Sequence, residues 1–427
     1  MREEIRVATL TLEVVEKRGF SFNKAFRVAC TKTNTRNPYI KLKAYEIAYK
    51  SLTKVYLSDY YLKLMGFKNL HTRRKCAFRV AFSLVLEGDL SVGLLGSYTG
   101  GLLPRKLLNA LKGVTREYLD SMLEKLDYLN RLSVKYSHPK WLVKTLSLFM
   151  SYKDLEALLR ANATQTKWIR VNTLKVSDER GRRKLESQGF VVEPDRDFPN
   201  LYRVIEAKKP LDEVKGIKEG LFIIQDKASV ATVYELDPHP NEVILDATMA
   251  PGLKAQLIAE LTEDRATLIA VDISERRLRE AKRLLKLYNV KNINIILSDS
   301  TMIKARSVDK VLIDPPCSNS GAIRRDPALR ITLRDVGKLR DYTGVQKLLV
   351  KNSLFNKATS YIVYSTCSLL PDECEAIIDE LVEESSLLKC RVGTVRGYRG
   401  FRSSKYAIRY FPHIHDTIGF FISKFTG

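Results

Sequence analysis

The chain has 427 residues, and its 72 lysines and arginines against 49 aspartates and glutamates give a net charge of +23. No apolar stretch approaches the ~18 residues that a membrane-spanning helix needs, and the charged first residues do not resemble a cleavable signal. Six cysteines without a Cys-x-x-Cys pair, together with five histidines, fit neither a disulfide framework nor a zinc site. We therefore expect a cytoplasmic protein with reduced thiols, no metal and no membrane attachment.

The positive charge is concentrated in the first third of the chain. Residues 1–150 hold 27 lysines and arginines against 12 acidic residues, whereas the remainder is closer to balance. A globular region this basic commonly binds a polyanion, and nucleic acid is the first candidate. The alternatives are a lysine-rich solvated surface or the ion pairs of a thermophilic protein, although ion pairs would need a more equal number of acidic residues.

Residues 1 to about 140 are predicted to be all-helical. Apolar residues recur there at spacings of three and four, and helix-breaking residues separate the repeats at Gly19, at Asn37-Pro38 and around Gly66. Two groups of basic residues, one in a predicted loop and one entering a helix, are candidates for phosphate contacts. The predicted helices cover residues 6–17, 20–30, 44–57 and 74–86, and the basic groups are Lys32, Arg36, Lys41 and Lys43, and Arg73, Arg74, Lys75 and Arg79.

Residues 141 to 240 are predicted to form a small α+β module. Residues 168–174 and 221–224 have the apolar, β-branched composition of strands, and a polar helix is expected at 177–188. The proline-containing stretch 236–240 is a predicted turn that leads into the last part of the chain.

From residue 241 to the end of the chain, predicted strands alternate with predicted helices. Repeated β-α-β units of this spacing indicate an α/β fold with a doubly wound parallel sheet and right-handed crossovers. The predicted strands cover residues 242–246, 267–272, 293–298, 310–314 and 360–365, and the predicted helices cover 253–261, 278–288 and 336–355.

Carboxylates end four of these predicted strands, at Asp246, Asp272, Asp299 and Asp314. Because the carboxyl ends of parallel strands meet at one edge of a sheet, these side chains should line one crevice. The loop that follows the first strand, residues 246–254, lacks the glycine pattern of dinucleotide sites and the Gly-Lys-Ser/Thr of triphosphate sites. An adenosine that carries a positive sulfonium would suit this acidic rim, with Asp272 placed to accept hydrogen bonds from a ribose diol.

Two cysteines, Cys317 and Cys367, each follow a β-branched run that reads as a buried strand. A side chain at the carboxyl end of such a strand points into the crevice where α/β proteins place their chemistry. A free cysteine is commonly a small buried hydrophobic residue. Two of them at equivalent strand ends, one directly after Asp-Pro-Pro, indicate a functional pair instead.

Three motifs occur in a fixed order: Asp-x-x-x-Ala-Pro-Gly-x-Lys at 246–254, Asp-Pro-Pro-Cys-Ser at 314–318 and Tyr-Ser-Thr-Cys-Ser at 364–368. In this order they closely resemble the RsmB/Sun family of RNA cytosine-5 methyltransferases. The segments 169–174, 224–229, 409–413 and 419–421 extend the resemblance, which covers roughly residues 138 to 427. The helical region resembles the NusB-like domain that precedes the catalytic part in some members.

The resemblance implies a methyl transfer from S-adenosylmethionine to C5 of a cytosine in rRNA or tRNA, by a protein that we expect to be a monomer. It also implies a mostly parallel, Rossmann-like methyltransferase domain at 241–427, preceded by two RNA-binding domains at 1–140 and 141–240. Asp272 would hold the ribose, Asp299 the adenine, and Asp314 the target cytosine or the reactive end of the cofactor. Cys367 would be the nucleophile, and Cys317 would help to release the product. The loop residues that would bind the cofactor are Thr248, Met249, Ala250, Pro251, Gly252, Leu253 and Lys254.

The proposed chemistry needs side chains of these types. Cytosine C5 is too weak a nucleophile to take a methyl group directly, but a thiolate that adds at C6 turns C5 into an enamine carbon. A neighbouring cation such as Lys254, or a helix N-terminus, would favour that thiolate. Asp314 could bind the N3 and N4 edge of the base, and removal of the C5 proton needs a second basic group, for which Cys317 is a candidate.

The cofactor loop departs from the family pattern at four positions, where Thr248, Met249, Leu253 and Ala255 replace Cys, Ala, Gly and Thr or Ser. Two alternatives therefore stay open. One is an RNA-binding protein on a methyltransferase scaffold with weakened catalysis. The other is a DNA cytosine methyltransferase, which would use the cysteine after the Asp-Pro-Pro turn as its nucleophile, whereas the Tyr-Ser-Thr-Cys-Ser motif and the small module favour RNA.

Overall fold

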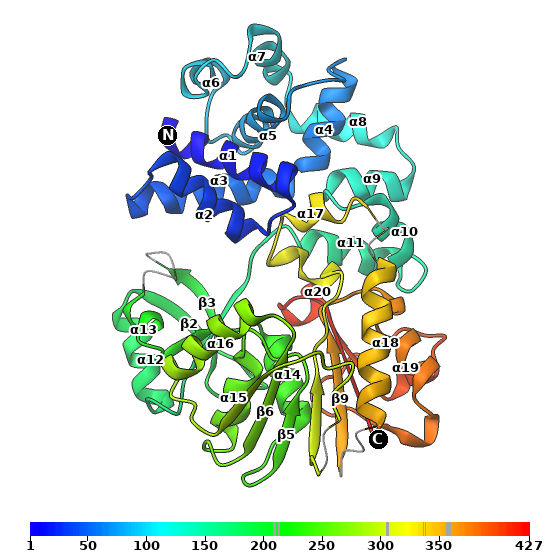
Figure 1. The fold of residues 1–427 in the computed structure, drawn as a ribbon. Coiled ribbons are helices and arrows are strands. Elements are labelled where there is room, and N and C mark those ends of the chain that lie inside the picture. Colours follow the sequence, from blue (N-terminus) through cyan, green and yellow to red (C-terminus); the bar gives the residue numbers. More distant parts are fainter. Residues whose placement is uncertain (208–210, 212–213, 305–306, 336, 338, 356–359) are drawn as a thin grey trace. The chain divides into compact units, whose positions relative to one another are not determined.

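A computed structural model describes the chain except residues 208–210, 212–213, 305–306, 336, 338 and 356–359 (Figure 1). The chain forms two compact units. The first contains Met1–Gln165 together with Ile323–Val336, and the second contains Thr166–Ala322 together with Gly337–Gly427. No helix in the described part of the chain is both long and apolar enough to cross a membrane.

The first unit is built from helices, as the apolar spacing predicts for most of its length. Helix α1 buries one face that includes Ile5, Leu12 and Val15, and it ends where Gly19 adopts φ 61°, a left-handed conformation that glycine takes without strain. The helices of this unit are α1 (Arg2–Arg18), α2 (Phe22–Thr33), α3 (Pro38–Thr53), α4 (Val55–Leu64), α5 (Thr72–Leu86), α6 (Val92–Tyr98), α7 (Arg105–Lys112), α8 (Arg116–Glu124), α9 (Tyr128–Lys135), α10 (Lys140–Leu146), α11 (Tyr152–Ala161) and α17 (Leu329–Thr332).

Two expectations for this region are wrong in detail. The single helix expected at 44–57 is two helices, because α3 ends at Thr53 and α4 begins at Val55, with Lys54 at φ −118° between them. The apolar spacing continues across Lys54, so the pattern does not reveal the break. The second correction is that Lys32 lies on α2, and Lys41 and Lys43 on α3, rather than in a loop. Asn37 caps α3 and Pro38 opens it.

The segment 323–335 packs in the helical unit although it follows the predicted strand that carries Asp314. Asp326 accepts a hydrogen bond from the backbone N–H of Phe22 at 2.9 Å, across 304 positions of sequence. The buried guanidinium of Arg330 donates to the carbonyl oxygen of Asn162 at 2.7 Å. The predicted division of the chain at residues 140 and 240 stays a prediction, and it would assign this segment to the third domain.

The second unit begins with a four-stranded antiparallel sheet in the order β2-β3-β1-β4. Two of its strands, β2 and β3, were not expected from the sequence, because charged residues interrupt their apolar runs. The elements of this part are β1 (Lys167–Val171), α12 (Asp178–Ser187), β2 (Phe190–Pro194), β3 (Leu201–Ala207), α13 (Lys215–Lys218) and β4 (Phe222–Ile224).

The larger sheet has the strand order β10-β12-β9-β8-β5-β6-β7, with β11 paired to β12. The strands from β9 to β7 are parallel, and β12 is antiparallel to β9. This confirms the α/β class with a mostly parallel sheet. Its strands are β5 (Val243–Asp246), β6 (Thr267–Asp272), β7 (Ile293–Leu297), β8 (Lys310–Ile313), β9 (Tyr361–Thr366), β10 (Leu387–Leu388), β11 (Ile408–Tyr410) and β12 (Phe420–Phe425), and its helices are α14 (Lys227–Leu236), α15 (Leu253–Leu261), α16 (Glu275–Leu287), α18 (Leu339–Phe355), α19 (Glu375–Leu381) and α20 (Pro412–His415).

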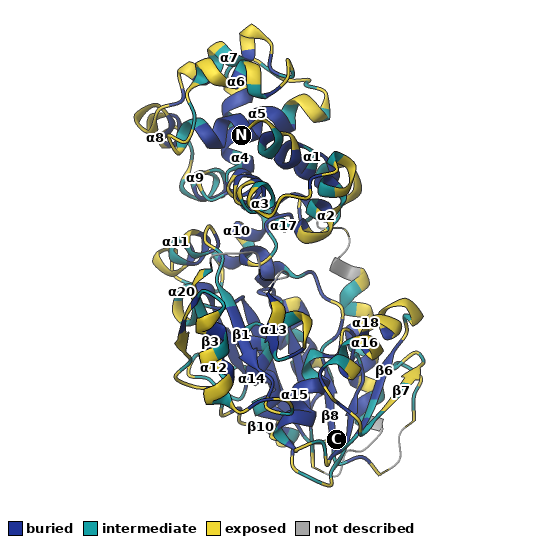
Figure 2. Ribbon diagram, turned by 90° about the vertical axis from the view of Figure 1, so that its left-hand side faces the viewer, coloured by how far each residue is buried: buried dark blue, intermediate teal, exposed yellow. Residues whose placement is uncertain are grey.

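The burial of each strand follows from its position in the sheet. Strand β8 lies in the middle of the sheet and is buried along its whole length, whereas the edge strand β7 alternates between half-buried and exposed positions. Figure 2 shows the buried residues along the strands and the exposed residues on the outer faces of the helices. Of the helix expected at 336–355, the structure has α18 from Leu339 onward, and residues 336 and 338 lie outside the described residues.

Candidate active site

The carboxyl ends of β5, β6, β8 and β9 lie at one edge of the parallel sheet, since these strands are neighbours in parallel register. The loop after β5 turns into α15 at Gly252, which adopts φ 94°. A Cβ atom at this position would come no closer than 3.5 Å to Leu285, an ordinary contact. The glycine is therefore required by the backbone conformation and not by lack of space.

Asp314 joins three of the predicted site segments. Its carboxylate contacts the Lys254 ammonium and accepts a hydrogen bond from the Ser365 hydroxyl at 3.3 Å. Its backbone N–H donates to the Thr248 hydroxyl oxygen at 2.9 Å. The Lys254 Nζ also lies 5.8 Å from the centre of the Phe420 ring. Thr248 and Lys254 of the first motif thus meet Asp314 of the second motif at one point.

The two predicted cysteines also meet. The Sγ atoms of Cys317 and Cys367 are 3.0 Å apart, within hydrogen-bonding distance. Cys317 is buried, and both its hydrogen bond with Cys367 and its burial raise the pKa of its thiol. Cys317 therefore keeps its proton and can donate it to the sulfur of Cys367, which is only half-buried.

Asn319 bridges the two cysteine loops and was not among the predicted site residues. Its Oδ1 accepts a hydrogen bond from the Cys367 thiol at 3.0 Å, and its Nδ2 donates to the carbonyl oxygen of Cys317 at 3.0 Å. Its backbone adopts φ 59°, which asparagine tolerates better than most residues. The signal in the sequence was its position two residues after Cys317.

A buried carboxylate, Glu373, also joins the same two loops. It accepts hydrogen bonds from the backbone N–H of Ser318 at 2.8 Å, from the Ser318 and Ser368 hydroxyls at 2.5 Å each, and from the Gln346 amide at 3.2 Å. Glu373 is fully buried. The sequence does not single out Glu373, because its partners lie 5 to 55 positions away.

Asp272 and Asp299 have different surroundings. Asp272 is only 4% exposed, and it accepts hydrogen bonds from the backbone N–H groups of Ser274 at 2.9 Å and Ala250 at 3.3 Å. The Arg277 guanidinium lies 3.4 Å from its Oδ2. Asp299 is exposed and accepts hydrogen bonds from Thr301. Asp272 is therefore tied to the loop after β5, whereas Asp299 stands at the edge of the sheet.

Two large apolar side chains are left in solvent beside these carboxylates. Ile273, which directly follows Asp272, is 69% exposed, and Met302, three positions after Asp299, is 77% exposed. Exposed apolar side chains near one buried and one exposed carboxylate fit a ligand that has both a flat apolar part and hydroxyl groups. Among the described residues, no group of three or more His, Cys, Asp and Glu side chains is arranged to hold a metal ion.

Asp246, at the end of β5, has an unusual environment. Burial raises the pKa of its carboxyl to about 7, although it accepts a hydrogen bond from the Thr248 backbone N–H at 3.2 Å. A carboxyl with a pKa of about 7 is only partly ionised near physiological pH, so Asp246 adds less negative charge beneath the loop than an ordinary aspartate would.

Two parts of the chain match known families. Residues 233–426 match the family described as 16S rRNA methyltransferase RsmB/F, and residues 138–207 match the RsmF/B-like ferredoxin-like domain. A probable ribosomal RNA small subunit methyltransferase B of Coxiella burnetii is 29% identical over 384 residues, which are 85% of this chain and 87% of that protein. The 25S rRNA (cytosine-C(5))-methyltransferase nop2 of Schizosaccharomyces pombe is 28% identical, and the match covers 72% of this chain but only 53% of that protein.

Solved structures give the same picture of the fold. The crystal structure of the protein PH0851 has a TM-score of 0.79 at 24% identity, and the match covers 100% of this chain and 99% of that chain. A methyltransferase homologue from Pyrococcus horikoshii has a TM-score of 0.61 at 27% identity, and covers 72% of this chain and 98% of its own.

Proposed function

Because the chain belongs to the RsmB/Sun family of RNA cytosine-5 methyltransferases, we propose that it transfers a methyl group from S-adenosylmethionine to C5 of a cytosine in ribosomal RNA. The observation that carries the proposal is the pair of thiols, Cys317 and Cys367, at 3.0 Å. Nucleophilic catalysis at a pyrimidine ring needs one thiol to attack and a second group to manage protons, and this edge of the sheet holds both.

The residues of this edge fit S-adenosylmethionine by their chemistry. Asp272 offers carboxylate oxygens for the ribose hydroxyls, and the exposed Ile273 offers an apolar surface for the flat adenine. Asp299 can accept from the adenine amino group, and the loop 248–254 would run along the methionine part. When it is bound, the cofactor supplies an electrophilic methyl group on a positively charged sulfur.

The thiol of Cys367 would be the attacking group. After it gives its proton to solvent, the sulfur forms a bond to C6, and the electron pair of the C5–C6 double bond moves to C5 and bonds to the methyl group. The methyl–sulfur bond breaks in the same step, and its electron pair stays on the cofactor's sulfur. Cys317, whose thiol keeps its proton in the resting protein, stabilises the neighbouring sulfur by a hydrogen bond. Lys254 offers a cation next to Asp314, and Asp314 would bind the N3 and N4 edge of the cytosine.

Release of the product needs the reverse order. The proton on C5 passes to a base, the C5–C6 double bond forms again, and the S–C6 bond breaks. Cys317 lies 3.0 Å from the Cys367 sulfur, but its thiol keeps its own proton, so we assign to it the positioning of that base and not the uptake of the C5 proton.

The test is methyl transfer by the full-length protein to ribosomal RNA that lacks the modification, with transfer RNA in a parallel reaction. Labelled methyl groups should appear in ribosomal RNA, and bisulfite sequencing should locate them at cytosine C5. The Cys367→Ala variant should transfer none. Label in transfer RNA alone would mean that the substrate is transfer RNA and not ribosomal RNA. Label in neither RNA would favour an RNA-binding protein on a methyltransferase scaffold.

A further inference from the structure

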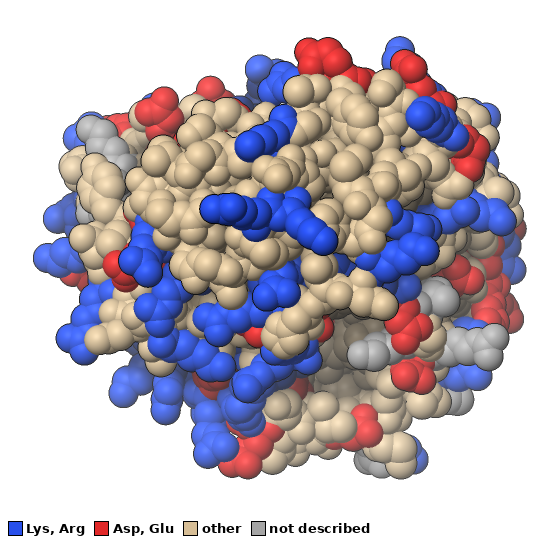
Figure 3. Space-filling view, turned by 90° about the horizontal axis from the view of Figure 1, so that it is seen from above, with Lys and Arg blue, Asp and Glu red and all other residues tan. Residues whose placement is uncertain are grey.

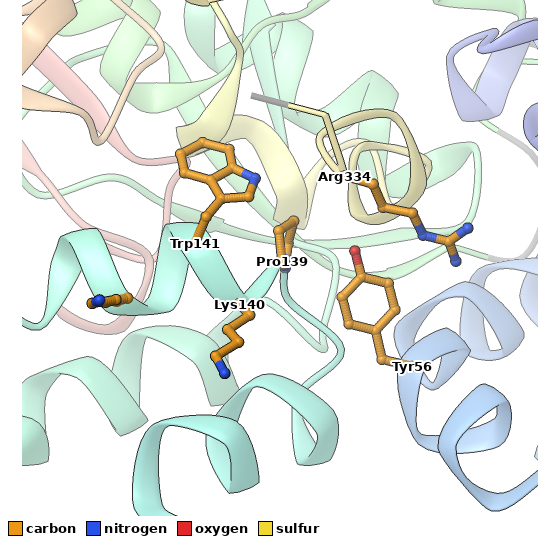
Figure 4. A pocket seen from close by; sticks show the side chains of 6 residues that line it. Tyr56, Pro139, Lys140, Trp141 and Arg334 are labelled. Atoms are coloured by element: carbon orange, nitrogen blue, oxygen red, sulfur yellow. The ribbon is translucent and has the colours of Figure 1, made fainter. Parts of the chain in front are cut away.

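A cavity of about 440 Å³ that is open to solvent lies in the helical unit. Figure 4 shows Tyr56 and Trp141 on either side of Pro139, with Lys140 nearby and Arg334 next to Tyr56. The cavity combines α4, the start of α10 and the segment after α17, all of which belong to the same compact unit. Its lining residues are Tyr56, Pro139, Lys140, Trp141, Lys144 and Arg334. We call this cavity the Trp141 pocket.

The aromatic rings of the pocket are held in place by their polar ends. The Tyr56 hydroxyl donates to the carbonyl oxygen of Arg330, and the Trp141 Nε1–H donates to that of Leu333, each at 2.7 Å. With these groups already bonded to the backbone, the rings offer the pocket mainly their apolar faces. Such faces stack on flat, unsaturated rings of any identity.

The charged groups of the pocket are all positive. Lys140, Lys144 and Arg334 are exposed, and none of the described lining residues is acidic. Arg334 lies 5.3 Å from the centre of the Tyr56 ring and is fixed by Glu16 at 2.9 Å. Fixed aromatic faces with lysines at the rim suit a ligand with a flat base and a negative phosphate.

A second cavity, of about 590 Å³, continues along the same helix. It contains Lys63, Phe67, Lys68 and Lys75 and begins at Asp59, three positions after Tyr56 on α4. Asp59, which lines this second cavity, contacts Lys75 at 3.1 Å and also contacts Arg334 of the Trp141 pocket at 3.4 Å. The repetition of lysines and aromatic rings suits successive nucleotides of one strand.

Not every basic residue in this region faces solvent, so fewer of them can contact a phosphate. Arg79, one of the residues expected to contact phosphate, is fully buried and bonded to Asp59 and Glu16. It holds the acidic side chains that in turn orient Arg334. In the face seen in Figure 3, lysine and arginine side chains are widespread, so charge alone does not single out a site. The aromatic rings do.

We infer that the Trp141 pocket binds an unpaired nucleotide of single-stranded RNA, with its base against Trp141 and Tyr56 and its phosphates at Lys140 and Lys144. This inference rests on the proposed function only in taking RNA as the ligand. It assigns to the helical unit a specific contact with an unpaired segment of the substrate, in addition to general attraction by charge.

The test measures RNA binding by the full-length protein without cofactor, using a labelled single-stranded oligonucleotide of mixed sequence and the same sequence as a duplex. The double variant Lys140→Gln/Lys144→Gln should bind the single strand roughly tenfold more weakly, and the slope of log K against log salt should fall by about 1.4 for two lost phosphate contacts. The matched control Lys112→Gln/Lys125→Gln removes the same charge at two exposed positions outside the pocket and should change affinity less than about twofold.

Tryptophan fluorescence gives a direct second readout, because the chain has two tryptophans, Trp141 and Trp168. Single-stranded RNA should quench the emission of the unaltered protein, and Trp141→Phe should abolish that quenching while it keeps an aromatic ring in the pocket. Three results would each overturn the inference. They are equal single-strand affinity of the pocket variant and the control variant, an equal loss of affinity for single-stranded and duplex RNA in the pocket variant, and quenching that survives in Trp141→Phe. Methyl transfer is measured separately, so the binding result can be interpreted even if the protein does not catalyse the proposed reaction.

Discussion

Asn319 and Cys367 are joined by a hydrogen bond in which the thiol donates to the side-chain Oδ1 across 3.0 Å. The same amide donates from Nδ2 to the carbonyl oxygen of Cys317. One side chain therefore sets the distance between the two loops that carry the cysteines and fixes the direction in which the Cys367 thiol points. Asn319 is a positioning residue under the proposed function, since it acts through Cys367.

Replacement of Asn319 by glycine should separate positioning from folding. Glycine adopts φ 59° without strain, so the backbone of the loop should be kept while the amide is lost. We expect the rate of methyl transfer to fall by roughly tenfold to a hundredfold, equivalent to one or two lost hydrogen bonds at the attacking group, with little change in the KM for RNA. Asn319→Ala should lose more, because alanine disfavours this conformation. Equal rates for Asn319→Gly and the unaltered protein would remove Asn319 from the site.

The two cysteines should be distinguishable by their products. If Cys367 attacks and Cys317 acts in release, Cys317→Ala should methylate the base and then stop before the S–C6 bond breaks. A protein–RNA adduct that survives denaturation should then accumulate, and only when cofactor and substrate RNA are both present. Cys367→Ala should form no adduct. Denaturing gels with labelled RNA measure this, and an adduct from Cys367→Ala instead would reverse the two roles, as in the DNA-enzyme alternative.

Asp272 should control the affinity for S-adenosylmethionine. Asp272→Ala removes charged hydrogen bonds of about 1.5–3 kcal/mol, which corresponds to a roughly tenfold to hundredfold weaker affinity in calorimetry. Because Asp272 also accepts from the backbone of Ala250, the loss could come from a loosened loop. Asp272→Asn keeps an acceptor for that N–H while it removes the charge, so it should weaken binding less than alanine. An affinity that neither variant changes would show that the ribose lies elsewhere.

Glu373 should contribute to stability more than its neighbour Asp372, although both are acidic. Glu373 is fully buried with four donors around it, whereas Asp372 is exposed. In Glu373→Gln an amide NH₂ would face groups that already donate, so we expect the free energy of unfolding to fall by about 2–3 kcal/mol. Asp372→Asn should change it by less than about 0.5 kcal/mol. Urea denaturation measures both. An unchanged free energy of unfolding in Glu373→Gln would mean that the hydrogen bonds of Ser318 and Ser368 do not require a negatively charged acceptor.

Much of the site could be predicted because its residues lie in short, ordered motifs. Strand ends in a parallel sheet meet by geometry, so Thr248, Lys254 and Asp314 could be expected near one another, and their contacts fit that expectation. Their catalytic and cofactor roles stay a prediction. Asn319 and Glu373 were not predicted, because their importance comes from partners across the strand ends and not from a pattern in their own neighbourhood.

In the helical unit, the local spacing of apolar residues predicts helices but not the contacts between segments far apart in the sequence. Apolar spacing predicted α1, α2 and α5 closely, but the contact between Asp326 and Phe22 joins segments 304 positions apart. No periodicity within residues 323–336 indicates that partner. One practical consequence follows: removal of residues 1–140 would strip this segment of its packing, so the role of the basic region in salt-dependent RNA binding is better measured by point substitutions than by deletion.

Asp246 should make the stability of the protein depend on pH in a direction opposite to most carboxylates. Its pKa is raised to about 7 in the folded state by burial, against about 3.8 for an ordinary aspartate. As pH rises from about 4 to 7, the unfolded chain ionises first, so the unfolded state gains stability relative to the folded one. Asp246→Asn cannot ionise, and it keeps an oxygen for the Thr248 N–H. Between pH 5 and pH 8 the free energy of unfolding of the unaltered protein should therefore fall by about 2.5 kcal/mol relative to Asp246→Asn. Groups distant from Asp246 titrate equally in both proteins and cancel in the difference, so a difference that stays constant between these two pH values would show that Asp246 is ionised throughout.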